Sequence, residues 1–215
     1  MFGREYAGLS IRRPGFKSRP EHQITDLKQI ILVTGTPGVG KSRLAGQLAK
    51  NGGYALVEVS NLVKKEGLYV QFDRKRGSYV VDERKLRKRL EALALSSEKM
   101  IVSSHIVGKY LPERLVRRVL VLRLDPTILY KRLRARGWTR RKAWENTEAE
   151  ILDISLQESL KLLGKNRVSE IDTTGRSALS LYNTAVRVLS RATTGRVGQV
   201  NWLARYDPIE LERRL

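Results

Sequence analysis

The eight residues GTPGVGKS, at positions 35–42, constrain the fold more than any other part of this sequence. They satisfy the pattern G-x-x-x-x-G-K-[ST], and they lie between the apolar run IILVT and a segment in which Leu44 and Leu48 are spaced for one face of a helix. The motif together with this context predicts a phosphate-binding loop rather than a chance glycine turn. We therefore expect a buried strand over 30–34 and a helix that begins near Lys41.

Each position of this loop has a chemical role. Gly35, Gly38 and Gly40 permit a tight backbone path whose N–H groups face phosphate oxygens, and the following helix adds its positive end. Lys41 is expected to contact the β- and γ-phosphates of a nucleoside triphosphate, and the Ser42 hydroxyl to ligate Mg²⁺. The predicted ATP-binding residues of the loop are Gly35, Pro37, Gly38, Val39, Gly40, Lys41 and Ser42.

Four further apolar runs have the length and composition of buried strands. They are YALVEV (54–59), KMIVS (99–103), RVLVLRL (118–124) and RVSEID (167–172). Helical segments separate them, so strands and helices alternate along the chain. This alternation predicts an α/β fold of the P-loop NTPase type, in which helices cover both faces of a five-stranded parallel sheet and ligands bind at the carboxyl ends of the strands.

The expected helices begin and end at local signals. Ser60 is a candidate N-cap of a short helix. Asp125 precedes Pro126, so we interpret it as the N-cap of the next helix and not as an acid of the site. Gly137 marks the end of that helix. The polar stretch 69–79 is too irregular for a core element. The other expected helices run from 82 to about 96, from about Arg141 through a seam of Leu152, Leu156, Leu160 and Leu163, and from 178 to 189.

The chain carries a net charge of +20 and contains no cysteine. The lack of cysteine excludes disulfides, thiolate metal sites and cysteine nucleophiles. Basic residues concentrate in the segment 109–142, where Glu113 and Asp125 are the only acids. Such a surface attracts polyanions, and we expect contact with RNA; the alternative is that these charges are the solvated faces of ordinary helices plus nucleotide ligands.

The sequence is long enough for one domain with a substantial core. Residues 1–28 mix Arg, Gly, Pro and Ser without a period, which indicates a flexible basic arm, and we expect the domain over 29–206 and a tail over 207–215. No apolar run approaches the roughly 20 residues that a membrane crossing needs, and the N-terminus lacks the apolar stretch of a secretion signal. These features predict a cytoplasmic protein without membrane contact.

The expected strand at 99–103 ends in Ser103, Ser104 and His105, and no acid occurs between Met100 and Pro112. A serine hydroxyl can hydrogen-bond a metal-bound water, but it brings no negative charge and is a poor general base. A lone histidine at a strand end is often a packing residue, so His105 has both a structural and a catalytic interpretation.

Several stretches together are similar to one family. They are ILVTGTPGVGKS, VSNLVKKEGLY, FDRKRGSYVVDE, VLRLDPTILYKRLRARGW, ENTEAEILDI, EIDTTGRS and GQVNWL, between about Ile30 and Tyr206. The sequence resembles the adenylate kinase isoenzyme 6 family, archaeal and nuclear adenylate kinases that also act in maturation of the small ribosomal subunit. The resemblance implies Mg²⁺-dependent phosphoryl transfer between ATP and AMP with possible ATPase activity, a monophosphate-binding segment at about 60–90 and a small helical lid at about 132–148.

The resemblance also assigns residues to the two substrates. Asn61 and Lys64 occupy AMP-binding positions, although the family usually has Asp and Arg there. Arg132 and Arg136 occupy lid positions that neutralise charge on the transferring phosphoryl group, with Arg136 also binding ATP. For Lys64 and the two arginines, an ordinary helix-surface charge is the alternative interpretation.

Two more strand ends carry implied site residues. Thr174 and Gly175 fall in the loop that holds the adenine base, although the threonine could equally cap the next helix. The family keeps Asp-x-His where this chain has Ser103 and His105, so the acid that fixes a magnesium-bound water is missing here. The implied catalytic residues are Lys41, His105, Arg132 and Arg136.

Three functions therefore stay open at this point. The first is an adenylate kinase that assists small-subunit ribosome assembly, with a small-subunit ribosomal protein of the platform and rRNA as partners. The second is a nucleotide-binding assembly factor with weakened turnover, which Ser103, Asn61 and the high positive charge favour. The third is a kinase for another nucleoside monophosphate, because the sequence does not reveal base selectivity.

Overall fold

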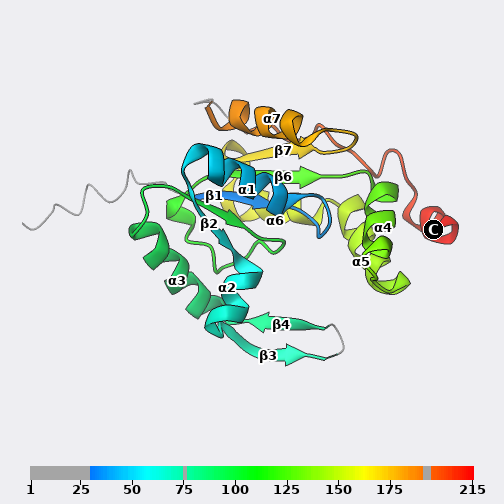
Figure 1. The fold of residues 1–215 in the computed structure, drawn as a ribbon. Helices are drawn as coiled ribbons and strands as arrows, with labels where there is room; N and C mark the ends of the chain where they lie inside the picture. Colours follow the sequence, from blue (N-terminus) through cyan, green and yellow to red (C-terminus); the bar gives the residue numbers. More distant parts are fainter. Residues whose placement is uncertain (1–29, 75–76, 191–194) are drawn as a thin grey trace, which may run out of the picture.

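The computed structural model describes residues 30–74, 77–190 and 195–215, and the arm expected over 1–28 lies outside them. A five-stranded parallel sheet with strand order β2-β5-β1-β6-β7 forms the centre of the described chain (Figure 1). Its strands are β1 (Ile30–Thr34), β2 (Ala55–Glu58), β5 (Met100–Ser103), β6 (Val116–Arg123) and β7 (Val168–Asp172). The predicted five-stranded parallel sheet is confirmed.

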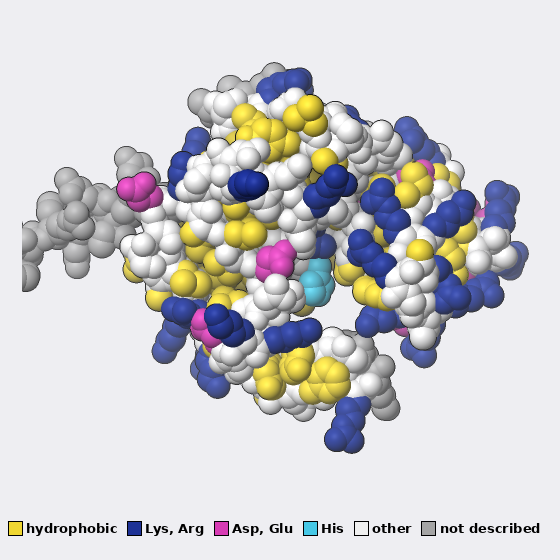
Figure 2. Space-filling view, in the orientation of Figure 1, with side chains coloured by type: hydrophobic (Ala, Val, Ile, Leu, Met, Phe, Trp, Pro, Cys, Tyr) yellow, Lys and Arg dark blue, Asp and Glu magenta, His cyan; other side chains and the backbone are white. Residues whose placement is uncertain are grey.

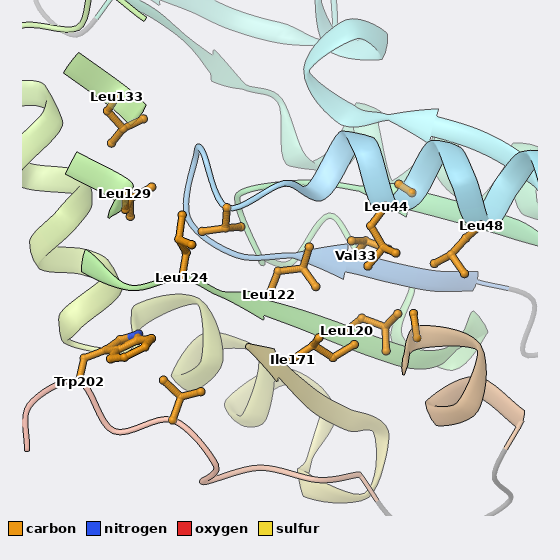
Figure 3. Packing of buried hydrophobic residues seen from close by; sticks show 14 of the residues in the cluster. Val33, Leu44, Leu48, Leu120, Leu122, Leu124, Leu129, Leu133, Ile171 and Trp202 are labelled. Carbon is orange, nitrogen blue, oxygen red and sulfur yellow. The ribbon is translucent and has the colours of Figure 1, made fainter. Parts of the chain in front are cut away.

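Successive side chains of a strand point to opposite faces of the sheet, and here both faces are apolar, so helices cover both of them. On one face, α1 (Lys41–Gly52) and α7 (Ala178–Ser190) pack over Val33, Leu120 and Ile171 through residues such as Leu44 and Leu48 (Figure 3). On the other face, α3 (Glu83–Leu95) and α6 (Ile154–Leu163) cover a second cluster of buried residues. That cluster includes Ile30, Leu32, Leu86, Leu90, Val102 and Leu156.

A small excursion follows β2. It consists of α2 (Val59–Glu66) and an antiparallel hairpin of β3 (Tyr69–Asp73) and β4 (Ser78–Val81). The prediction that Ser60 caps α2 is wrong: the helix begins at Val59, and Glu58, two residues before Ser60, occupies the N-cap position. The stretch expected to be irregular lies outside the main sheet and forms this hairpin, in which the tilted rings of Tyr69 and Tyr79 have their centroids 4.4 Å apart.

The helices beyond β6 depart from expectation at one point. Asp125 accepts hydrogen bonds from the N–H groups of Thr127 and Ile128, so its predicted role as N-cap of α4 (Pro126–Ala135) is confirmed. The single long helix expected from about Arg141 is wrong, because the chain forms α5 (Arg140–Ile151) and α6 with a break at Asp153. Asp153 has φ 57°, a left-handed conformation that ends one helix and redirects the chain.

The C-terminal part ends in a short helix beside α5. The segment expected to be a tail contains α8 (Pro208–Arg214), which packs against α5 and buries Leu211 in the first core cluster. Two single-turn 3₁₀ helices, η2 (Glu113–Leu115) and η3 (Lys165–Arg167), lead into β6 and β7. None of the helices in the described ranges is long and apolar enough to cross a membrane.

Candidate functional site

The loop between β1 and α1 follows a path that only glycine tolerates. Gly35 has φ 132°, and a Cβ there would lie 2.4 Å from the carbonyl oxygen of Leu122 on β6. Gly40 has φ 108° immediately before the first residue of α1. The loop therefore presses against the sheet and presents the positive end of α1 at the carboxyl edge of the strands.

Lys41 lies inside this loop, where its ammonium donates a hydrogen bond to the Thr36 carbonyl oxygen over 3.0 Å. Burial lowers the pKa of Lys41 to about 8; the carboxylates of Glu150 and Glu58 oppose this shift, and Arg136 adds to it. The charge of Arg136, one of the two predicted lid arginines, therefore acts on the loop lysine. A phosphate oxygen can replace the Thr36 carbonyl as the acceptor, because a hydrogen bond from an ammonium to an anion is the stronger one.

A cleft opens beside the loop at the carboxyl ends of β2 and β5. Figure 2 shows the histidine and an acidic side chain side by side in a hollow of this face, with basic side chains beyond it over α4 and α5. The cleft is lined by Pro37, Lys41, Ser42, Glu58, Ser60, Ser103, Ser104 and His105. The structure thus brings the loop lysine and serine together with the strand end that ends in Ser103 and His105.

The two serines of this strand end differ in their surroundings. Ser104 belongs to a local network: it accepts a hydrogen bond from the Tyr110 hydroxyl at 2.7 Å and donates one to the Ile106 carbonyl at 2.8 Å. Ser103 is the register partner of Val33 on β1 and of Glu58 on β2. Ser104 therefore shapes the turn after β5, whereas Ser103 faces the cleft between the loop strand and the edge strand.

His105 lies at the mouth of the cleft and remains partly open to solvent. The cleft's partial burial and the nearby charge of Lys41 lower the pKa of His105 below its usual 6.5. The imidazole is consequently neutral at pH 7, so it can donate from one ring nitrogen and accept at the other.

Glu58 is the acid that sequence patterns did not single out. It is the last residue of β2 and the only Asp or Glu among the described residues that line the cleft. No motif marks it, and its position beside Ser103 depends on the pairing of strands that are about forty residues apart in the chain. The available signal was its place at a strand end, the edge where ligands bind in parallel sheets.

A second hollow lies on the other side of the loop, between α1 and α7. It is lined by Val39, Gly40, Arg43, Leu44, Gln47, Arg132, Thr173, Arg176, Ala178 and Leu181. Arg132, one of the two arginines predicted for a lid, approaches the Gly38 carbonyl oxygen at 3.5 Å and so lies against the phosphate loop. The hollow therefore adjoins the phosphate loop through Val39 and Gly40.

Thr173 and Arg176 line this second hollow, and Thr174 and Gly175 stand between them in the sequence. The Thr174 hydroxyl accepts a hydrogen bond from the Asp125 N–H at 2.9 Å, which joins the ends of β6 and β7. The alternative that it caps the next helix is wrong, because α7 begins at Ala178 and the Ser177 hydroxyl accepts from the Ser180 N–H.

The two residues expected to bind the monophosphate lie on α2. The Asn61 side chain donates a hydrogen bond to the Glu58 carboxylate at 2.8 Å. Lys64 is exposed one turn further along, with its ammonium 5.9 Å from the centre of the Tyr79 ring. Asn61 is thus connected to the cleft through Glu58, while Lys64 faces the hairpin.

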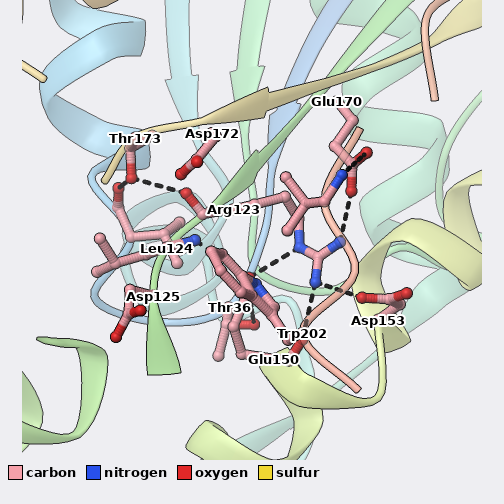
Figure 4. A network of polar contacts seen from close by, with 12 residues as sticks. Thr36, Arg123, Leu124, Asp125, Glu150, Asp153, Glu170, Asp172, Thr173 and Trp202 are labelled. Carbon is pink, nitrogen blue, oxygen red and sulfur yellow. Dashed lines mark hydrogen bonds and ion pairs between the residues drawn. The ribbon is translucent and has the colours of Figure 1, made fainter. Parts of the chain in front are cut away.

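A buried ionic network holds the phosphate loop from behind (Figure 4). One carboxylate oxygen of Glu150 accepts a hydrogen bond from the Thr36 hydroxyl at 2.6 Å, and the other accepts from the Arg123 guanidinium at 2.8 Å. The Trp202 indole N–H donates to the same carboxylate at 3.2 Å. Burial raises the pKa of Glu150, while the positive charge of Arg123 opposes that shift. Glu150 thus links the loop to α5 and to the C-terminal segment.

Arg123 is the centre of this network. It forms ion pairs with Glu150, Glu170 and Asp153, and its own side chain is 1% exposed. Asp153 is the residue at which α5 gives way to α6, so the ion pair holds the left-handed turn in place. Three carboxylates around one guanidinium make this a rigid support and not a substrate site, because no face of the guanidinium reaches the cleft.

Sequence comparisons identify relatives of the chain. The sequence model of a family described as "AAA domain" matches residues 31–153. A protein named "Putative adenylate kinase" from Methanocaldococcus jannaschii is 34% identical over 183 residues, covering 85% of this chain and 98% of that protein. A protein of the same name from Saccharolobus solfataricus is 37% identical over 177 residues, covering 81% of this chain and 87% of that protein. The chain belongs to the family of these archaeal proteins named putative adenylate kinase.

Solved structures with a similar fold include two kinases. A shikimate kinase from Bacteroides thetaiotaomicron has a TM-score of 0.50 and 16% identity, covering 76% of this chain and 99% of that one. A sugar kinase from Janibacter has a TM-score of 0.50 and 19% identity, covering 76% of this chain and 95% of that one. At this level of identity the likeness concerns the fold alone, which is that of P-loop nucleotide-binding proteins.

Proposed function

We propose that this protein is an adenylate kinase of the isoenzyme 6 type, which transfers a phosphoryl group between ATP and AMP. The observation that carries the proposal is the phosphate loop with a separate hollow on each side. One lies between α1 and α7, and the other lies at the ends of β2 and β5 beside α2. A donor and an acceptor nucleotide bound on opposite sides of one loop could meet in line at the Lys41 ammonium.

Charge neutralisation is the main catalytic contribution of the chain's residues. In this proposal Lys41 and the loop N–H groups bind the donor phosphates, and Arg132 and Arg136 bind the transferring group as α4 and α5 close. The Arg132 contact with the Gly38 carbonyl and the effect of the Arg136 charge on Lys41 support these roles. Thr36, which Glu150 holds, keeps the loop in place beneath Lys41. Neutral His105 at the cleft mouth can hydrogen-bond either the acceptor phosphate or an attacking water, and the second role would give ATPase activity.

The cleft also fits a magnesium ion. Mg²⁺ prefers oxygen ligands, retains several waters, and commonly takes one or two protein ligands plus substrate phosphates. Ser42 and Ser103 supply hydroxyl oxygens and Glu58 supplies a carboxylate in the same cleft. Ser42 would hold the ion directly, and the bound ion would neutralise charge between the β- and γ-phosphates.

The direct test is a coupled assay for ADP formation from ATP and AMP, with Ser103→Asp measured beside the wild type. We expect wild-type turnover in the range of roughly 1–100 s⁻¹ that kinases show. A panel of CMP, GMP and UMP as acceptors determines base selectivity, and AMP should be preferred. Activity that appears only in the Ser103→Asp variant would instead support the second function, a nucleotide-binding assembly factor with weakened turnover.

The basic surface supports a role beyond the kinase reaction. Basic side chains gather over α4 and α5 in Figure 2, and the whole chain carries a net charge of +20. We propose that this surface contacts rRNA during small-subunit ribosome assembly, with a ribosomal protein of the platform as the protein partner implied by the resemblance. The electrostatic part of this proposal predicts a steep dependence of RNA binding on salt.

A further inference from the structure

We propose that Glu58 supplies the negative charge that fixes the magnesium-bound water in this cleft, in place of an acid at the end of β5. The proposal rests on the nucleotide-binding function proposed above and adds the residue that completes the metal site. Its basis is the position of Glu58 in the sheet, the residues that line the cleft with it and the hydrogen bond that its carboxylate accepts.

The sheet places Glu58 one strand away from the position without an acid. Glu58 on β2 is the register partner of Ser103 on β5, and Ser103 is in turn the partner of Val33 on β1, two residues before the loop begins. Register partners on neighbouring parallel strands lie roughly 4.8 Å apart, with their side chains on the same face. A carboxylate at Glu58 is therefore further from the loop than one at position 103, and glutamate regains part of this distance with its extra methylene.

The distance favours contact with the metal through water. Direct Mg²⁺ ligands lie about 2.0–2.1 Å from the ion, and the ion normally keeps several of its waters in kinase sites. A carboxylate set back by one strand suits a hydrogen bond to such a water better than direct ligation. Ser103, between Glu58 and the loop, can hydrogen-bond the same water layer through its hydroxyl.

The local contacts of Glu58 keep its carboxylate available to the cleft. Glu58 occupies the N-cap position of α2, yet its side chain makes no capping hydrogen bond to the helix. Instead, the Asn61 amide donates to one carboxylate oxygen at 2.8 Å. Because this donor is neutral, it leaves the negative charge of Glu58 unneutralised. The positive end of α2 further favours the anion. The carboxylate also acts on Lys41, whose pKa it raises against the effect of burial.

The test measures metal binding and not turnover. Mn²⁺ stands in for Mg²⁺, and electron paramagnetic resonance follows the free ion as it is taken up by the protein and ADP. We expect Glu58→Gln to weaken Mn²⁺ binding to the ADP complex by about 10- to 100-fold, the usual cost of losing such an outer partner. Binding of ADP without metal, measured by calorimetry, should change little and shows that the variant is folded.

Two variants make the comparison specific. Glu98→Gln removes the same charge from an exposed residue just before β5, at the opposite end of that strand, and should leave Mn²⁺ binding unchanged. The double variant Glu58→Gln with Ser103→Asp restores an acid one strand away and should recover most of the lost affinity. If Glu58→Gln does not fold, Glu58→Asp takes its place, and we expect a smaller but measurable loss from the shorter side chain.

Mn²⁺ binding by the Glu58 variants that equals that of the wild type would overturn the proposal, as would a wild-type ADP complex that takes up no Mn²⁺. The outcome is separable from that of the kinase proposal. A wild type that binds Mn²⁺ through Glu58 but forms no ADP from ATP and AMP would refute the kinase proposal only. Normal kinase turnover with Mn²⁺ binding independent of Glu58 would refute only the metal role.

Discussion

At the level of single residues, the buried loop lysine makes nucleotide binding sensitive to mildly alkaline pH. The pKa of Lys41 in the free protein is about 8, because burial disfavours its charged form. Phosphate binds the protonated ammonium, so ATP affinity should be constant below that value and fall by up to about tenfold per pH unit above it. Calorimetric titrations of ATP between about pH 7.5 and about pH 9.5 measure this directly.

Two variants identify the titrating group as Lys41. In Lys41→Arg the side chain stays charged over the whole range, so whatever affinity remains should lose its pH dependence. Arg136→Ala removes a charge that lowers the Lys41 pKa, and it should move the decline in affinity to higher pH. Wild-type affinity that stays flat up to about pH 9.5 would show that the free lysine does not titrate near 8.

The loop residues could be predicted from sequence because each has a role that is local to eight consecutive positions. Gly35 has a φ of 132°, and the ammonium of partly buried Lys41 donates to the Thr36 carbonyl oxygen within the same motif. Glu58 could not be predicted in the same way. Its carboxylate enters the cleft only because β2 pairs with β5, and the sequence contains no local sign of that pairing.

At the level of elements, the support behind the phosphate loop depends on one residue of α5. Glu150→Ala would remove the partner of Thr36 and Trp202 and one of the carboxylates around buried Arg123. Breaking a buried ion pair from one side usually costs about 3–5 kcal/mol, because the remaining charge is left in a poorly solvated place. We expect a loss of this size in the free energy of unfolding, measured by urea denaturation.

A residue two positions earlier on the same helix provides the control. Glu148 is exposed on α5, and Glu148→Ala should change the free energy of unfolding by no more than about 0.5 kcal/mol. Equal effects of the two substitutions would contradict a structural role for the network. Because Glu150 also holds Thr36, its loss should weaken ATP binding as well, whereas Glu148→Ala should not affect it.

This network also explains why one helix boundary was missed. The leucines from Leu152 to Leu163 keep a helical spacing, so the sequence predicts continuous helix through Asp153. The break is caused by the tertiary ion pair between Asp153 and Arg123, which lies thirty residues earlier on β6. Asp125, by contrast, was predicted correctly as an N-cap because its partners, Thr127 and Ile128, are adjacent in the chain.

At the level of the whole molecule, the unequal distribution of charge fits the two proposed functions of the surface, nucleotide binding and RNA binding. Among the described residues, Glu58 is the one acid that lines the cleft, whereas basic side chains gather on the face formed by α4 and α5. A positive face next to the cleft attracts nucleotides at long range, and an extended polyanion could occupy it without entering the cleft. Nucleotide binding and RNA binding should then differ in their response to salt.

RNA binding tests the second of these functions. Each phosphate contact should contribute about −0.7 to −0.9 to the slope of log affinity against log salt concentration, so a surface with six or more contacts loses about 10³-fold in affinity between about 50 and 200 mM salt. Lys131→Gln with Arg141→Gln on α4 and α5 should reduce the slope by up to two contacts, measured by fluorescence anisotropy with an rRNA fragment.

The matched double variant Arg84→Gln with Lys88→Gln removes two exposed charges from α3, on the other side of the fold in Figure 1, and should leave the slope unchanged. If the two double variants reduce the slope equally, the positive charge acts as a general field and α4 and α5 form no defined RNA surface; if the wild type binds no RNA at low salt, the basic face serves the nucleotides alone.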